Sequence, residues 1–248
     1  MLKTWFLNFI IYFISSGFFY LFFSFFLKKN QSKKIQLLDA PISHRFREFK
    51  NSFIAIIFST SISLLIINPY TIPYTLMYMD GDKYGIPYFI FSILVCLFLH
   101  DTYFYWTHRL LHRPFFRFVH KVHHQSTNPT SWSAFAFHPI EAIIQAFILS
   151  LLPFIIPLHP IALLVFFIII MIWDAYGHSG FEIFSKRFLM SKWGRWINSS
   201  ITHNMHHEFY EGNYGLYFRF WDIWMKTSHP KYNDHIVKVK DREAKKKP

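Results

Sequence analysis

The stretch Ala142–Trp173, AIIQAFILSLLPFIIPLHPIALLVFFIIIMIW, decides the fold class of this chain. It runs for 32 residues without Asp, Glu, Lys or Arg, whereas one membrane-spanning helix needs about 20 apolar residues. Pro153, Pro157 and Pro160 lie in its middle, and proline interrupts a helix because it lacks a backbone N–H. The pattern therefore predicts two helices in a hairpin that turns near Leu158–Pro160.

Three further apolar runs precede this stretch. Trp5–Leu27 and Asn51–Met79 contain no formal charge, and Tyr84–His100 is the third run. No cleavage site with small residues follows the first run, so we expect it to remain in the protein. Together with the hairpin, these runs predict an all-α integral membrane helical bundle with about four to five membrane segments.

The composition supports a membrane protein. Hydrophobic residues make up 52% of the chain and charged residues only 16%, against roughly 25% charged residues in a soluble domain. The single cysteine, Cys96, excludes a disulfide scaffold and a thiolate metal site. The net charge of +12 comes largely from loops and the C-terminal tail, such as Lys245–Lys247. We therefore expect attraction to anionic lipid rather than to nucleic acid.

The loop charges predict an orientation in the membrane. The loop between the first two apolar runs is basic, whereas the next loop holds only Asp80, Asp82 and Lys83. Because basic loops stay in the cytoplasm, the first loop and every histidine group described below are expected on the cytoplasmic side. The membrane would be the inner membrane of a bacterium or the endoplasmic reticulum of a eukaryote. The basic residues of the first loop are Lys28, Lys29, Lys33, Lys34, Arg45, Arg47 and Lys50.

Eight histidines fall into three short groups that indicate metal binding. Residues three and four positions apart share one face of a helix, so each group should present its imidazoles together. One metal ion cannot use eight ligands, and two ions fit the number better. Two further histidines could complete the two shells, His138 and His178. The three groups are His108 and His112, then His120, His123 and His124, and finally His203, His206 and His207.

The residues alone leave three classes of protein open. Imidazole binds zinc, copper, iron and nickel, so the ligands do not select the metal. A membrane zinc hydrolase would be expected to contain H-E-x-x-H, which is absent. A metal transporter would hold its ligands within the spans, whereas these groups follow or separate the apolar runs. A two-metal site beside lipid suits a third class, enzymes that activate O2 against a lipid C–H bond.

Ordered motifs between Leu94 and His229 carry a family resemblance. They are YWTHRLLH at 105–112, HKVHH at 120–124, AFHP at 136–139, HNMHH at 203–207, and GNYG at 212–215 followed by FWD at 220–222. With these motifs the chain resembles the fatty acid hydroxylase/sterol desaturase superfamily of integral membrane di-iron enzymes. Its motifs are most similar to the sterol C5-desaturase-like branch.

The resemblance implies an activity, a cofactor and partners. It implies a di-iron centre of two iron ions that hydroxylates or desaturates a sterol-type or fatty-acyl-type lipid with O2. Electrons would come from a separate cytochrome b5-like or ferredoxin-like donor and its reductase. The iron ligands that it implies are His108, His112, His120, His123, His124, His203, His206 and His207, with His178 and His138 matching further family histidines.

One departure and several neighbours bear on the ligand set. The family often has another histidine four residues before His178, and this chain has Asp174 there. His100 lies two helical turns before His108 and could face the same site. Ligating histidines usually donate their second N–H to an acid or carbonyl. The acids available for this role are Asp101, Glu141, Asp174, Glu208 and Asp222.

Three regions are expected along the chain. Residues 1–83 would form N-terminal membrane segments, and residues 84–230 a catalytic domain whose cytoplasmic histidine-rich helical cap carries the metals. Residues 231–248 are polar and basic, which predicts a solvated or disordered tail.

Overall fold

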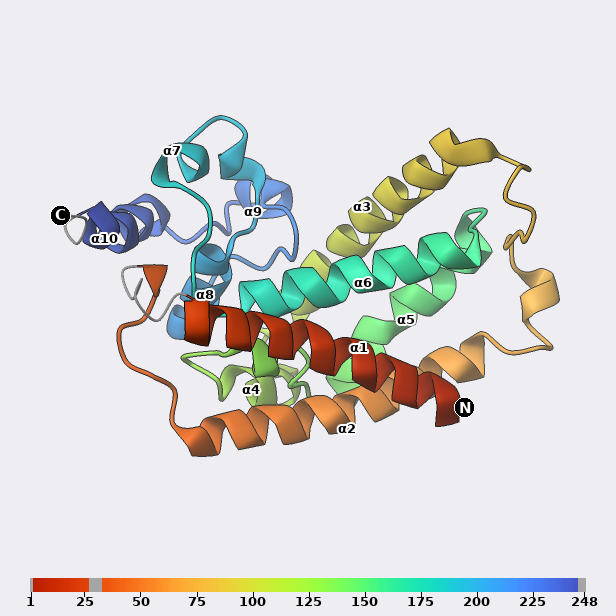
Figure 1. Ribbon diagram of the computed structural model, residues 1–248, viewed down its shortest axis with the longest axis horizontal. Coiled ribbons are helices and arrows are strands. Elements are labelled where there is room, and N and C mark those ends of the chain that lie inside the picture. Colours follow the sequence, from red (N-terminus) through yellow and green to blue (C-terminus); the bar gives the residue numbers. More distant parts are fainter. Residues whose placement is uncertain (1, 27–32, 245–248) are drawn as a thin grey trace.

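The computed structural model describes residues 2–26 and 33–244, and the regular elements in this part of the chain are all helices (Figure 1). Two isolated β-bridges occur there, and no strand forms among the described residues. Lys28 and Lys29 of the basic first loop, and Lys245–Lys247 of the basic tail, lie outside the described residues. The short elements are η1 (Phe22–Phe26), η3 (Ile72–Tyr74), η4 (Ser131–Ser133), α7 (Lys186–Leu189), η5 (Gly194–Trp196) and α9 (Phe220–Trp224).

Five long helices form the membrane bundle. Four of them are long and apolar enough to cross a membrane: α1 (Leu2–Leu21), α2 (Ile42–Ile66), α3 (Gly85–Leu111) and α6 (Pro160–Gly177). The fifth helix, α5 (Pro139–Ile155), is apolar but shorter. The predicted bundle of four to five membrane segments is therefore confirmed, and the chain is a multi-pass membrane protein.

The predicted hairpin is also confirmed. Helix α5 ends at Ile155 and α6 begins at Pro160, so the turn lies where the three prolines indicated it. Pro160 occupies the first turn of α6, where its missing N–H is not needed. Leu158 is fully buried in the turn and packs against Leu152 and Phe166 in one apolar cluster.

Two helices extend further than the charge-free runs. Helix α2 begins at Ile42, nine residues before Asn51, and α3 continues past His100 to Leu111. The added residues include Glu48 and Asp101, which are both buried and hydrogen-bonded within the protein. Runs without charged residues therefore underestimate the length of a helix where its charged side chains face protein instead of lipid.

The long helices pack in pairs. Helix α2 packs against α5, α1 against α6, and α3 against both members of the hairpin (Figure 1). Side-chain hydrogen bonds join some of these helices: Asn8 Nδ2 donates to Thr60 Oγ1 at 2.9 Å, and Ser150 Oγ to Ser63 Oγ at 3.0 Å. Such bonds satisfy polar groups that lipid could not.

The remaining helices gather at one end of the bundle. Helices α7 to α10 lie there, opposite the α5–α6 turn and residues 67–84 (Figure 1). This cap includes α8 (Ser200–Phe209), and α4 (Arg117–His124) faces the same end with its histidines. Residues 33–41, which lead into α2, lie at this end as well (Figure 1).

The expectation of a solvated or disordered tail is wrong for the described part of it. Residues Tyr232–Ala244 form helix α10, and Tyr232, Ile236 and Val239 are buried against α7 and α8. These residues are few, but their spacing of four and then three places them on one helical stripe. Composition alone therefore missed a packed amphipathic helix.

The packing of α10 predicts a difference between two identical truncations. Val239→Ala should lower the free energy of unfolding by about 2 kcal/mol, because Val239 is fully buried. Val237→Ala removes the same methyl groups from a half-buried position and should cost about 0.5 kcal/mol. Thermal unfolding of the detergent-solubilised protein measures both, and equal losses would contradict the packing of this helix.

Candidate metal centre

Nine of the ten histidines predicted as ligands converge in two neighbouring groups. In each group, one ligand atom per histidine lies within 4.8 Å of all the others. Eight of the nine side chains are buried, and His112 is half-buried. Group A contains His108, His112, His120, His124 and His206, and group B contains His123, His178, His203 and His207.

Helices α4 and α8 each supply both groups. In α4, the i,i+4 pair His120 and His124 belongs to group A, whereas His123 belongs to group B. In α8 the assignment is reversed, because the pair His203 and His207 joins group B and His206 joins group A. Each H-x2-H-H motif is therefore divided between the two groups, whereas its spacing predicts that all three imidazoles share one face of the helix.

The ends of two spanning helices complete the groups. His108 lies in the last turn of α3 and His112 follows as its C-cap, and both belong to group A. His178 is the C-cap of α6 and belongs to group B. The ends of α3 and α6 therefore place these three histidines directly at the end of the membrane bundle.

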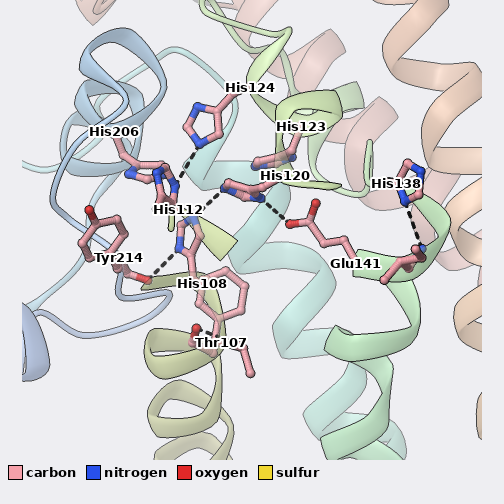
Figure 2. Close-up of polar contacts among 12 residues, drawn as sticks. Thr107, His108, His112, His120, His123, His124, His138, Glu141, His206 and Tyr214 are labelled. Atoms are coloured by element: carbon pink, nitrogen blue, oxygen red, sulfur yellow. Dashed lines mark hydrogen bonds and ion pairs between the residues drawn. The ribbon is translucent and has the colours of Figure 1, made fainter. Parts of the chain in front are cut away.

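Backbone carbonyls fix the tautomers of two histidines in group A. His108 Nδ1 donates to the Tyr214 carbonyl at 2.9 Å (Figure 2), and His206 Nδ1 donates to the Gly212 carbonyl at 2.7 Å. A carbonyl oxygen only accepts, so each Nδ1 carries the hydrogen and each Nε2 carries a lone pair. Both lone pairs are then free to bind a metal ion.

A carboxylate orients one histidine in each group by contacting its Nδ1 atom. His120 Nδ1 lies 2.6 Å from Glu141 Oε1 (Figure 2), and both side chains are buried. His178 Nδ1 lies 3.1 Å from Asp174 Oδ1 and 2.8 Å from the Asp174 carbonyl. Asp174 thus contacts a histidine of group B and is absent from the group of ligand atoms itself.

The ring nitrogens that face one another fit a bound cation. His108 Nε2 and His120 Nε2 lie 3.0 Å apart, and their Nδ1 partners leave neither of them a hydrogen to share. Two lone pairs at this distance repel unless a cation lies between them. Burial and the neighbouring imidazoles hold the pKa of His120 well below its usual value, so a proton is a poor candidate.

The spacing in group B matches a metal ion in size. Nε2 of His178 lies 2.9, 3.2 and 3.3 Å from Nε2 of His203, His207 and His123, and the His203–His207 distance is 3.1 Å. These four of the six distances average about 3.1 Å, and a regular tetrahedron with edges of that length has its centre about 1.9 Å from its corners, close to the roughly 2.0–2.1 Å of a zinc–imidazole bond. The residues present therefore fit a metal ion in each group.

The imidazoles outside the spans are held in their neutral form. Burial is the largest cause, and neighbouring imidazoles add to it. A metal ion needs neutral imidazole, so the ligands are ready to bind at neutral pH. The pKa is lowered well below its usual value for His123, His124, His203, His206 and His207, and to about 2 for His112.

Two of the candidate acids act on the histidines indirectly. Asp222 accepts the backbone N–H groups of Tyr214 and Gly215 at 2.9 and 2.8 Å. Asp101 Oδ1 accepts three successive N–H groups from residues 216–218. Together they hold the loop whose carbonyl orients His108. The fifth acid, Glu208, pairs with His235 outside both groups.

Gly212 is required in this loop. Its φ of 71° lies in the left-handed region, and a Cβ there would meet the Thr227 carbonyl oxygen at 2.5 Å. The motif at 212–215 does more than form a turn. Its backbone carbonyls orient two histidines, a role that side-chain identity does not reveal.

Three of the histidines outside both groups cap a helix or bond within the protein. His138, predicted as a ligand, lies apart from the cluster (Figure 2) and is the N-cap of α5, where its Nδ1 accepts the N–H of Ile140 at 3.3 Å. His159 caps α6 in the same way before Pro160, so the His-Pro pair is a capping pattern here. His100 bonds through Nδ1 to the Tyr217 hydroxyl at 2.8 Å and is absent from both groups.

The contacts of Glu141 and Asp174 predict selective loss of metal from one group. Glu141→Gln should weaken metal binding in group A by about tenfold to a hundredfold, because a neutral amide is a poorer acceptor for His120. Asp174→Asn should act on group B through His178. Metal content per chain during titration with a chelator measures both effects. Glu208→Gln is the control, and full metal retention in Glu141→Gln would contradict the assignment.

Comparisons with known proteins agree with this geometry. The family model described as Fatty acid hydroxylase matches residues 93–227, more than half of the chain. The Delta(7)-sterol 5(6)-desaturase ERG3B of Gibberella zeae is 30% identical over 195 residues, 75% of this chain and 59% of that protein. Human lathosterol oxidase is 38% identical over 140 residues, 56% of this chain and 45% of that protein.

A third relative, the Delta(7)-sterol 5(6)-desaturase ERG3 of Saccharomyces cerevisiae, is 28% identical over 170 residues, 68% of this chain and 44% of that protein. The chain thus spans about half the length of the curated relatives that it matches. No solved structure matches it significantly. The matched residues 93–227 contain all nine converging histidines, and the chain belongs to the fatty acid hydroxylase family.

Proposed function

We propose that this chain is a membrane-bound oxygenase with two iron ions that hydroxylates or desaturates a lipid. The observation that carries the proposal is the convergence of nine histidines into two adjacent groups at the end of a membrane bundle. The names of the relatives add the type of reaction, since a desaturase and an oxidase both oxidise their substrate. These names also favour a sterol-type substrate.

The type of reaction excludes zinc from the metals that the ligands leave open, and the family resemblance favours iron among the others. Imidazole suits several metals, but zinc has no redox chemistry and cannot accept or donate electrons in an oxidation. Iron bound in the two groups would supply the activation of O2 against an unreactive C–H bond. The nine histidines would hold the two ions, while Glu141, Asp174 and the carbonyls of Gly212 and Tyr214 keep four of the rings oriented.

A cavity inside the bundle lies beside residues that contact the two groups, and we propose that the lipid binds there. It lies between helices α1, α2, α3, α5 and α6 and reaches Leu216 of the loop after α8. Asp174, which bonds His178, and Ala142, next to Glu141, both line it. Most other lining side chains are apolar, so they would bind a hydrocarbon and exclude water from the reacting carbon.

The rival classes fit this arrangement less well. A transporter would hold the metal near the middle of the spans, whereas the ligands here lie at the ends of α3 and α6 and on the short helices α4 and α8. A zinc hydrolase would be expected to contain the motif H-E-x-x-H, whose acid activates water, and the chain lacks this motif. Both remain distinguishable by metal content and by reaction.

The proposal includes the partners and the location that the sequence implies. Electrons would come from a separate cytochrome b5-like or ferredoxin-like protein with its reductase, and the histidine groups would face the cytoplasm. Residues 84–230 would be the catalytic domain. Residues 1–83 would contribute to the same site, because Asn8 of α1 and Thr60 of α2 line the cavity.

The lipids of an expressing cell test the reaction. Cells that produce the chain aerobically should accumulate lipids that have gained one oxygen atom or lost two hydrogen atoms, measured by mass spectrometry of total lipid. His206→Ala should abolish these products, because it removes a group A ligand. Growth without oxygen should abolish them as well. Identical lipid profiles for the two chains, both expressed and with the first loaded with metal, would contradict the proposal.

The metal content tests the cofactor separately. The purified chain should contain about two iron ions, measured by elemental analysis, because the histidines form two groups. His178→Ala should lose about one ion, whereas His138→Ala should retain both, since His138 caps a helix. A chain that holds only zinc, or loss of metal in His138→Ala, would count against the assignment.

A further inference from the structure

A buried glutamine in the cavity lacks any bonding partner. Gln145 on α5 is 8% exposed and lines the cavity described above. Neither its Oε1 nor its Nε2 has a hydrogen-bond partner in the structure. A buried amide without partners destabilises a fold, so its presence needs an explanation outside the folded chain itself.

The other polar side chains of the cavity already have partners. Asn8 bonds Thr60, Ser63 accepts from Ser150, and Asp174 bonds His178. His100 bonds the Tyr217 hydroxyl. Gln145 therefore differs from these neighbours in having both a donor and an acceptor free to bind a ligand.

Gln145 lies on α5 one helical turn from Glu141, which contacts group A. It lies four residues after Glu141, so both side chains project from the same face of α5, about 6 Å apart along the axis. Glu141 contacts His120 of group A. A ligand group held by Gln145 would therefore lie about one helical turn deeper in the bundle than Glu141.

The lining restricts the chemistry of that group. No lysine or arginine is among the described residues that line the cavity, so a phosphate or carboxylate would lack a counter-ion. A carboxamide offers a donor and an acceptor together, which a hydroxyl complements with its own acceptor and donor. The mostly apolar walls fit the rest of a hydrocarbon lipid.

We infer that Gln145 binds the hydroxyl group of a neutral lipid alcohol and thereby selects such lipids over their hydrocarbon analogues. The inference rests on the proposed function, because it gives the cavity a lipid substrate. It makes Gln145 a specificity-determining residue whose bond positions the hydrocarbon next to Ala142 and Asp174.

Equilibrium binding to the purified full chain in nanodiscs tests the inference without turnover. The probes are two pairs, lathosterol with its deoxy analogue and stearyl alcohol with octadecane. In at least one pair, the wild-type chain should bind the alcohol about tenfold to a hundredfold more tightly than the hydrocarbon. Gln145→Met has a similar shape without the amide and should reduce this preference to about threefold or less.

Control variants separate recognition from folding. Ser150→Ala removes a buried hydroxyl of the same helix that bonds within the protein, and it should keep the preference. Without ligand, Gln145→Met should unfold at a temperature no lower than the wild type, because the amide has no partner to lose. Gln145→Leu repeats the test with a second apolar side chain.

Three outcomes would overturn the inference. They are an equal affinity of the wild type for alcohol and hydrocarbon in both pairs, no binding of any probe, and a preference that persists in both Gln145 variants. Because the assay needs neither O2 nor reductant, its result is independent of the lipid oxidation that tests the proposed function. Alcohol binding without oxidation would contradict the proposed function alone.

Discussion

Lone pairs of buried imidazoles that face one another are the constraint on which this structure depends. The acceptors around His108 and His120 keep hydrogens on Nδ1, so their Nε2 atoms meet at 3.0 Å without a proton between them. Burial disfavours the proton that could relieve this repulsion. A metal ion converts the repulsion into coordination. Under our proposal, the ions thus stabilise the end of the bundle and also supply its chemistry.

The membrane helices and the cap depend on each other at this end. Asp101 lies within the span α3, yet it binds the backbone of the loop that follows α8. That loop returns the carbonyl of Tyr214 to His108, which lies seven residues after Asp101 on the same helix. A polar residue inside a span is costly in lipid. Here backbone N–H groups inside the protein satisfy Asp101. Its bonds to the loop also hold the Tyr214 carbonyl in place beside His108.

The sequence predicted the broad arrangement because its signals are local. Prolines within an apolar run located the hairpin, and histidine spacing located eight of the nine residues that converge in the two groups. The rest depends on contacts between distant residues. His138 matches a family histidine but caps a helix, and α10 is packed although its composition is polar. The missing partners of Gln145 become visible only when the walls of the cavity are assembled.

The division of each H-x2-H-H motif explains how two metal sites can be kept at a fixed separation. Residues i+3 and i+4 of one helix differ by about 1.5 Å in height and about 100° in direction, so adjacent imidazoles must diverge. His123 and His124 diverge into groups B and A, and His206 and His207 into A and B. Because α4 and α8 are each shared in this way, neither group can shift without moving the other. Under our proposal two ions would act on one O2 molecule, and two short helices are enough to hold the two groups at the fixed separation that this would need.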